Sequence, residues 1–292
     1  MSLDTNTAAA FASSWNNLPP GSVYTRDQFE DWLTPLTKDN VVGRSVLELG
    51  CGNASLLVHM AAWGPSKLVG VDLGDSVLSA TENLRGTQHP NARIEKGDLT
   101  EFRSDGFDVV YCIGVLHHLK DPKLGFRSVV ENTKANGAFH CWVYGKEGNA
   151  LVRLVVEPLR HVTSRLPWWF TKYLVATPLV APYYLYAKLL RIVHDSATPH
   201  LRRFLRYLPL YEYSLWIANR EFQFFRHVAF DQLVTPQTRY IGRSEVLDWL
   251  NSVPRIDQKS TYVISRNGNS WKFGGRVNSK PGASDPEGAK AN

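Results

Sequence analysis

The sequence Val46-Leu47-Glu48-Leu49-Gly50-Cys51-Gly52-Asn53-Ala54-Ser55 decides the fold of this chain. An apolar run contains Glu48, two glycines follow one residue apart, and a helical pattern begins at Ala54 and continues to about Trp63. This order predicts a strand, a tight turn and the start of a helix. Such a helix presents free N–H groups and the positive end of its dipole, and glycine lets a ligand approach the backbone. The turn is therefore a candidate nucleotide-binding site.

The same pattern of strand and helix repeats along the first half of the chain. Strands are predicted over 45–49, 67–72, 92–96, 107–112 and 138–144. Between them, a helix capped by Asp75 is expected to reach Leu84, and another to span about 122–134. Five alternations with short loops are typical of an α/β fold with a Rossmann-like, doubly wound, mostly parallel sheet.

Near the C-terminus the pattern predicts an antiparallel finish to this sheet. Ser244 is expected to cap a helix through Leu250. Two strands, 259–265 and 270–277, flank Asn267-Gly268-Asn269, and an Asn-Gly turn between strands is typical of a hairpin.

We divide the chain into five segments by composition. They are an N-terminal cap segment (1–40), an α/β core (41–149), a helical aromatic and basic insertion (150–228), a return to the core (229–278) and a tail (279–292). The tail is rich in Pro, Gly and Ala and is predicted to be disordered. Residues 1–20 are polar and are expected to be loosely ordered. The aromatic residues of the cap segment could cover a ligand or the edge of the sheet; these are Phe11, Trp15, Tyr24, Phe29 and Trp32.

Composition points to a soluble cytoplasmic protein. The 292 residues are 43% hydrophobic, so a sizeable core can form. The three cysteines, each in or next to an apolar run, favour a reducing compartment over a disulfide framework. The N-terminus has no signal-peptide pattern. The longest uncharged apolar stretch, 173–187, contains two prolines and is shorter than the roughly 20 residues that a membrane span needs.

The insertion is distinctive in charge and in aromatic content. Residues 151–226 contain 11 Lys or Arg against 4 Asp or Glu, and 15 of the 34 aromatic residues of the chain. Prolines are expected to break its helices. We interpret the segment as a lid over a pocket for a large apolar acceptor with an acidic group. Alternatives are docking on an anionic membrane, a helical subdomain with a solvated basic face and, ranked lower, RNA binding.

Polar side chains follow the strands at the end where ligands of such sheets bind. Glu48 suits a bound ammonium, Asp72 can accept from a ribose diol, and Asp98 from an adenine amine on whose ring Leu99 can pack. Neighbouring candidates are Gly50, Cys51, Gly52, Leu73, Cys112 and Ile113. No phosphate loop is present, and Glu48 would repel pyrophosphate. These residues favour an adenosine ligand that carries an ammonium.

Five stretches resemble the class I S-adenosylmethionine-dependent methyltransferases: 46–55, 68–76, 94–102, 107–122 and 137–149. The resemblance covers the first half of the chain. It implies S-adenosylmethionine as cofactor, with the methionine part at Gly50 and Gly52, the ribose at Asp72 and adenine at Asp98. Ala54 stands where the family has a third glycine; because alanine is small and favours helices, the site is expected to survive. The segment 11–33 is similar to the cap of a ubiquinone/menaquinone-type subgroup.

Methyl transfer mainly requires alignment of the acceptor with an activated methyl group, and no metal is expected. A base helps a hydroxyl acceptor. The candidates are His117, His118 and Tyr144, and of the two histidines His117 is favoured to face the crevice. We expect O- or C-methylation of a small acceptor, because the Asn/Asp-Pro-Pro-Tyr loop of nucleobase and glutamine enzymes is absent. Arg239, Tyr240 and Arg243 are placed near the same cavity. A non-catalytic cofactor-binding protein is the alternative.

Overall fold

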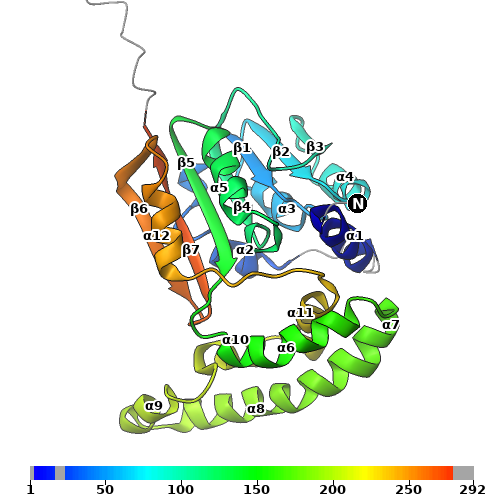
Figure 1. Cartoon of the computed structure of the whole chain (residues 1–292). Helices are drawn as coiled ribbons and strands as arrows, with labels where there is room; N and C mark the ends of the chain where they lie inside the picture. Colours follow the sequence, from blue (N-terminus) through cyan, green and yellow to red (C-terminus); the bar gives the residue numbers. More distant parts are fainter. Residues whose placement is uncertain (1–2, 17–23, 279–292) are drawn as a thin grey trace, which may run out of the picture.

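A seven-stranded sheet with helices on both faces forms the core of the molecule (Figure 1). The computed structural model describes residues 3–16 and 24–278, without the side chains of residues 3 and 13–16. The strand order is β3-β2-β1-β4-β5-β7-β6. Chain order reverses between β1 and β4, and their carboxyl ends therefore flank the crevice in which doubly wound sheets bind ligands.

The strands agree closely with those predicted. They are β1 (Ser45–Leu49), β2 (Lys67–Asp72), β3 (Ala92–Lys96), β4 (Phe107–Ile113), β5 (Thr133–Tyr144), β6 (Ile256–Arg266) and β7 (Ser270–Val277). The first five are parallel, and β7 pairs antiparallel with both β5 and β6. All five residues of β1 are buried, as expected for a central strand covered on both faces.

Two layers of helices cover the sheet. Buried side chains of α5 (Pro122–Glu131) and α12 (Arg243–Asn251) pack on one face. Those of α2 (Arg26–Leu33), α3 (Ser55–Ala61) and α4 (Val77–Arg85) pack on the other. Two short 3-10 helices, η1 (Lys38–Asn40) and η2 (Leu116–His118), complete the core.

A third group of helices lies across the carboxyl ends of the strands (Figure 1). It contains the predicted insertion, 150–228, but α11 continues the layer to Val234, so the return to the core begins after 234 and not at 229. The layer comprises α6 (Ala150–Thr163), α7 (Trp168–Phe170), the π-helix η3 (Thr171–Ala176), α8 (Thr177–Ser196), α9 (Pro199–Leu205), α10 (Tyr211–Ala218) and α11 (Phe222–Val234). Two small apolar clusters join α6, η3, α8, α10 and α11. The layer therefore has an inner face toward the sheet and an outer face.

The N-terminus was wrongly expected to be loosely ordered. Residues Leu3–Asn16 form helix α1, next to α11 (Figure 1). Three consecutive alanines favour the helix. Its start is fixed because the Lys120 N–H donates to Asp4 Oδ1 at 2.7 Å. Residues 17–23 and the tail, 279–292, lie outside the described residues.

Smaller differences concern helix boundaries and prolines. Ser76 and Gly242, rather than Asp75 and Ser244, precede α4 and α12. Pro158 and Pro182 lie inside α6 and α8 instead of breaking them. Both prolines are exposed, so water can reach the carbonyl oxygens that lose their helical partners.

Candidate active site

A cavity of about 280 Å³ lies between the carboxyl ends of the central strands and the helical layer. Its walls come from α1, α2, the turn after β1, the ends of β2, β4 and β5, the inner face of α6, α10 and α11, and the end of β6. Segments far apart in the sequence thus meet around one space.

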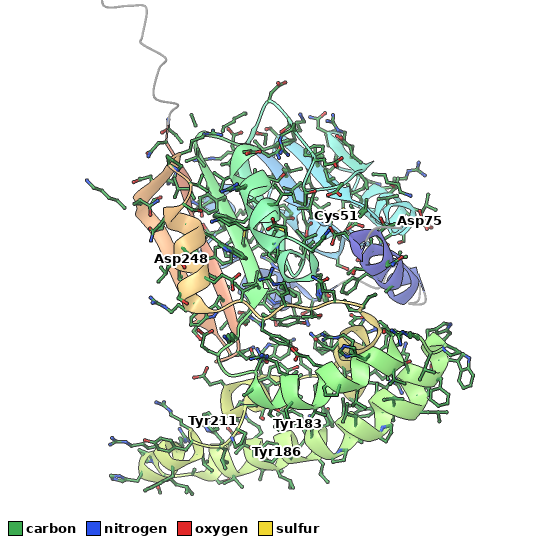
Figure 2. The ribbon with its side chains drawn as sticks, viewed as in Figure 1. Cys51, Asp75, Tyr183, Tyr186, Tyr211 and Asp248 are labelled. Carbon is green, nitrogen blue, oxygen red and sulfur yellow. The ribbon has the colours of Figure 1, made fainter. Side chains whose placement is uncertain are left out.

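The glycine turn brings the backbone to the cavity wall. Gly50 and Gly52 have φ of +80° and +55°, which favour glycine. A Cβ on Gly50 would lie 2.4 Å from Val115 Cγ2, so no larger residue fits there. The turn is tied to the next strand because the N–H groups of Gly50 and Cys51 donate to Val71 O at 2.7 and 3.0 Å. Figure 2 labels Cys51, which lies at the sheet, above the helical layer in that view.

Asp72 at the end of β2 is held rigidly by its neighbours. Its Oδ2 accepts from the Gly52 N–H at 2.8 Å, and its Oδ1 accepts from the Gly74 N–H at 2.9 Å and the Ser76 hydroxyl at 3.0 Å. A carboxylate has about four acceptor positions. One position on Oδ2 is therefore left for a ligand hydroxyl.

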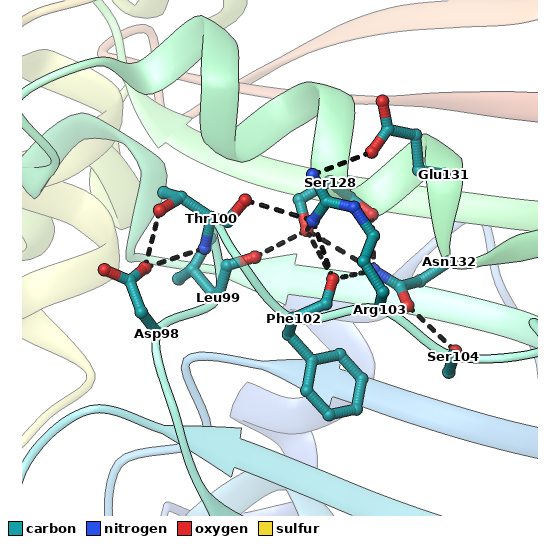
Figure 3. Close-up of polar contacts among 9 residues, drawn as sticks. All are labelled: Asp98, Leu99, Thr100, Phe102, Arg103, Ser104, Ser128, Glu131 and Asn132. Atoms are coloured by element: carbon teal, nitrogen blue, oxygen red, sulfur yellow. Dashed lines mark hydrogen bonds and ion pairs between the residues drawn. The ribbon is translucent and has the colours of Figure 1, made fainter.

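Asp98 and the loop after β3 are held by hydrogen bonds within the loop and to Ser128 and Asn132 (Figure 3). Asp98 Oδ1 accepts from the N–H and the hydroxyl of Thr100 at 2.8 and 2.7 Å, which leaves Oδ2 for a ligand amine. The Ser128 hydroxyl donates to Leu99 O, and Asn132 Nδ2 donates to Phe102 O at 3.0 Å. Helix α5 thus positions the backbone that carries Asp98 and Leu99, and both residues line the cavity.

Glu48 is a buried carboxyl at the cavity wall, 2% exposed. Burial raises its pKa well above the usual value, and the nearby Asp72 carboxylate raises it further. The Tyr111 hydroxyl donates to Glu48 Oε2 at 3.0 Å and opposes this shift. Among the described residues no cation pairs with Glu48, so a ligand ammonium is the group that would favour its charged form.

The other predicted cofactor residues divide into two groups. Gly50, Cys51, Gly52, Leu73, Leu99 and Ile113 line the cavity together with Glu48, Asp72 and Asp98. Cys112 does not, because adjacent strand residues point to opposite faces of a sheet. Its side chain is fully buried in the cluster on the α5 side.

The structure distinguishes the two adjacent histidines. His118 lines the cavity, and its Nδ1 lies 3.0 Å from Gln237 O, an acceptor only. The Thr238 hydroxyl also lies 3.1 Å from Nδ1. A proton on Nδ1 satisfies the contact with Gln237 O, and in that tautomer Nε2 keeps its lone pair. Burial lowers the pKa of His118 to about 4, so the ring is neutral at neutral pH.

His117, which the sequence favoured, lies behind His118 and not on the cavity wall. It is fully buried, and its Nδ1 accepts the backbone N–H of Tyr144 at 3.4 Å. Its lone pair is therefore used within the protein. Tyr144 does line the cavity, 4.3 Å from the His117 ring by centroids, and burial raises the pKa of its hydroxyl.

One end of the cavity is strongly aromatic. Of the three residues that we expected near the cavity from the sequence, Tyr240 lines it, whereas Arg239 and Arg243 do not. Of the cap aromatics, three line the cavity and Phe29 is buried in the core; the side chain of Trp15 is not among those described. The aromatic lining consists of Phe11, Tyr24, Trp32, Trp142, Tyr144, Tyr213, Trp216, Phe224 and Tyr240.

Arg266 is the cationic residue of this aromatic end, and the sequence did not identify it. Its Nε donates to Asp31 Oδ2 at 2.9 Å, its Nη2 donates to the same oxygen, and Trp216 and Trp32 surround it with ring centroids 5.0 and 5.6 Å away. The Nη1 donors remain for a ligand. Position 266 ends a strand far from the glycine turn in sequence, and only the antiparallel hairpin brings it here.

Two further features of the described chain concern ligands and membranes. Among these residues no group of three or more His, Cys, Asp or Glu could hold a metal ion. Within the same part of the chain, none of the helices combines the length and apolar character needed to cross a bilayer.

Comparison with known proteins places residues 47–139 in a methyltransferase domain family. The ubiquinone biosynthesis O-methyltransferase of Neisseria meningitidis serogroup A / serotype 4A is 28% identical over 123 residues, which cover 40% of this chain and 51% of that one. The tRNA U34 carboxymethyltransferase of Helicobacter pylori strain G27 is 36% identical over 109 residues, 36% of this chain and 40% of that one. The chain thus spans about half or less of the length of the relatives it matches.

Solved structures are similar at lower identity. Magnesium protoporphyrin IX methyltransferase from Synechocystis PCC 6803, with bound SAH, has a TM-score of 0.48 and 13% identity, over 87% of this chain and 81% of that one. The matched family region, 47–139, contains the glycine turn, Asp72, Asp98 and both histidines, and it ends before the helical layer.

Proposed function

We propose that this chain, whose residues 47–139 match a methyltransferase domain family, is a class I S-adenosylmethionine-dependent methyltransferase that transfers a methyl group to a small aromatic or amphipathic acceptor in the aromatic end of the cavity. The observation that carries this proposal is a single cavity lined both by Glu48, Asp72 and Asp98 and by the aromatic residues of the helical layer. The first set suits the cofactor and the second suits an apolar acceptor.

The cofactor is S-adenosylmethionine, and three acids would bind its three polar parts. Glu48 would pair with the ammonium, Asp72 Oδ2 would accept from one ribose hydroxyl, and Asp98 Oδ2 would accept from the adenine amine. Gly50, Gly52, Cys51, Leu73, Leu99 and Ile113 would contact the apolar atoms between them. The hydrogen bonds that already hold Asp72 and Asp98 support this assignment, because they fix both carboxylates before the ligand arrives.

The sulfonium supplies an activated methyl group, so the residues need only align and deprotonate the acceptor. When bound, the cofactor would supply the methyl group to the acceptor oxygen and keep the electron pair of the broken S–C bond on its sulfur. His118 Nε2 would take the acceptor proton. Tyr144, whose raised pKa keeps its hydroxyl protonated, would donate a hydrogen bond to the acceptor.

The charge of the cavity supports a small acceptor rather than a nucleic acid. Among the charged side chains that line the cavity, acids predominate, and Arg266 is the single Arg or Lys. A phosphate backbone would be repelled there. Arg266, with its Nη1 donors available, favours an acceptor that has a carboxylate or another oxygen-rich group beside an apolar ring.

A panel of phenols and hydroxybenzoates tests the proposal, with formation of S-adenosylhomocysteine as the readout. We expect turnover with some panel members, and His118→Gln should lower kcat about a hundredfold or more while cofactor affinity is kept. His117→Gln should leave the pH profile of kcat unchanged. Arg266→Met should raise KM only for acceptors with an anionic group. Cofactor binding without turnover on any acceptor would instead indicate a non-catalytic protein.

A further inference from the structure

Large apolar side chains are concentrated on the outer face of the helical layer. Twenty large hydrophobic residues are exposed in the described chain, and 16 of them fall within residues 151–208. Soluble monomers rarely expose such an extended apolar surface without a partner. Twelve of the 16 form what we call the outer apolar face: Trp168, Trp169, Tyr173, Leu174, Leu185, Leu189, Ile192, Val193, Leu201, Phe204, Tyr207 and Leu208.

The long helix formed by α7, η3 and α8 is amphipathic, and its apolar stripe is unpartnered. Leu185, Leu189 and Ile192 are 61%, 54% and 64% exposed and recur at helical spacing. On the opposite side of α8, Val180 and Ala187 are buried against α10 and α11. In Figure 1 this helix and α9 form the edge of the molecule farthest from the sheet. Figure 2 shows Tyr183 and Tyr186 within this layer.

Basic residues surround this face. Residues 165–208 contain seven Lys or Arg and one acid, Asp195, which pairs with Arg191 at 2.8 Å. Arg202, Arg203 and Arg206 are exposed on and just after α9, between the exposed Leu201 and Tyr207. The outer apolar face is thus a positively charged apolar surface.

We propose that the outer apolar face docks on an anionic lipid membrane, with α8 lying in the plane of the interface. Helices that bind in this way combine Lys and Arg with Trp, Phe and Leu, and anionic headgroups attract basic segments. Trp168 and Trp169 at one end of the face and Tyr207 at the other suit the headgroup level. A second copy of the chain is disfavoured as the occupant, because pairing would bring two positive surfaces together.

Docking in this orientation would place the cavity beside the bilayer. The inner side of the same helical layer lines the cavity through residues such as Val152 and Phe224. An apolar acceptor dissolved in lipid would therefore have a short path into the site. The docking proposal itself does not depend on the reaction, since lipid binding is measured without cofactor or acceptor.

Co-sedimentation with vesicles tests the proposal. The full chain should bind vesicles of phosphatidylcholine and phosphatidylglycerol, bind pure phosphatidylcholine more weakly, and lose affinity as salt is added. The variant Leu185→Gln/Leu189→Gln/Ile192→Gln should bind at least about tenfold more weakly, because each change removes apolar area that enters the interface. These side chains are exposed, and circular dichroism should show the fold unchanged.

Matched variants distinguish docking from a general effect of surface charge or hydrophobicity. Val42→Gln/Leu78→Gln/Leu124→Gln removes three exposed apolar residues elsewhere and should bind vesicles as the wild type does. Arg202→Glu/Arg203→Glu/Arg206→Glu should abolish the preference for anionic lipid, whereas the same reversal at the exposed Lys38, Arg127 and Lys259 should keep it. Three results would overturn the proposal. The wild type could fail to bind vesicles, or the two triple Gln variants could lose vesicle affinity equally. The third is a stable dimer that only the variant Leu185→Gln/Leu189→Gln/Ile192→Gln dissociates.

Discussion

Ala54 has a backbone conformation that an alanine side chain disfavours. It precedes α3 with φ of +64°, in the left-handed region. The sequence suggested that alanine is acceptable there as a helix former, but the structure places it before the helix, where helix propensity does not apply. The cost of this conformation is about 1–2 kcal/mol for a residue with a Cβ.

Replacing this alanine should therefore stabilise the protein. We predict that Ala54→Gly raises the free energy of unfolding by about 0.5–1 kcal/mol, since the relief of strain exceeds the entropy that glycine adds to the unfolded chain. Urea denaturation measures the change. The control, Ala61→Gly within α3, should lose about 1 kcal/mol. A loss of stability in Ala54→Gly would show that the residue is not strained.

Glu48 predicts the direction of a pH effect on cofactor binding. Burial raises the pKa of Glu48 above the ordinary 4.5. In the free protein the carboxyl is therefore mainly neutral between pH 4.5 and the raised pKa. The protonated Glu48 contributes to the stability of the fold at low pH, and this contribution is lost as pH rises from 4.5 through the raised pKa. A ligand ammonium favours the charged form, so affinity should rise with pH over the same interval and binding should release a proton.

Titration calorimetry in buffers of different ionisation enthalpy measures that proton. Glu48→Gln should keep a partner for the Tyr111 hydroxyl, bind about tenfold to a hundredfold more weakly, and release no proton. Identical proton release in the wild type and the variant would mean that Glu48 does not meet the ammonium.

Helix α5 supports the site without touching the ligand. Asn132 follows the helix, is fully buried, and donates to Phe102 O at 3.0 Å and to Ser128 O at 2.9 Å, while the Ser104 hydroxyl donates to its Oδ1 at 2.8 Å (Figure 3). The loop that carries Asp98 is thereby held against the helix.

Asn132→Ala should disrupt this support. It removes the two hydrogen bonds that the buried Nδ2 donates, while Phe102 O keeps Arg103 Nη1 and Ser128 O keeps the backbone N–H of residue 132 as donors. We therefore predict a loss of about 1–2 kcal/mol in stability together with weaker cofactor binding. Chemical denaturation and calorimetry measure the two effects. Ser104→Ala, at an exposed position of the same network, should cost under about 1 kcal/mol and leave binding unchanged. Equal effects of both changes would contradict this role for Asn132.

Elements with a strong local pattern were predictable from the sequence, and long-range placement was not. The strands from 45 to 144 and the C-terminal hairpin have clear apolar runs and turn residues, and the structure confirms them. The choice between His117 and His118 depends on a backbone N–H from β5 and a carbonyl near residue 237, neither of which leaves a local signal. Helix α1 has a weak local signal, because polar residues outnumber its three consecutive alanines.

At the scale of the molecule, the cavity exists because three units close around it. The glycine turn and strand ends form its floor, α1 and α2 form one side, and the helical layer forms the roof. The alternation of strands and helices predicted a parallel sheet whose carboxyl strand ends share one edge, and so the acidic cofactor end was predictable. The aromatic end was not, because Trp142, Trp216 and Arg266 come together only when the insertion and the hairpin fold onto the core.

The central claim is that S-adenosylmethionine binds between Glu48, Asp72 and Asp98, and its calorimetric titration into the whole protein tests that claim most directly. We predict one equivalent bound, with affinity lowered about a hundredfold in Asp72→Asn. Asp75→Asn is the matched control: this neighbouring carboxylate is exposed, pairs with Lys96 at 2.6 Å and lies outside the lining, so binding should not change. Absence of binding at millimolar cofactor, or equal affinities in the two folded variants, would contradict the account.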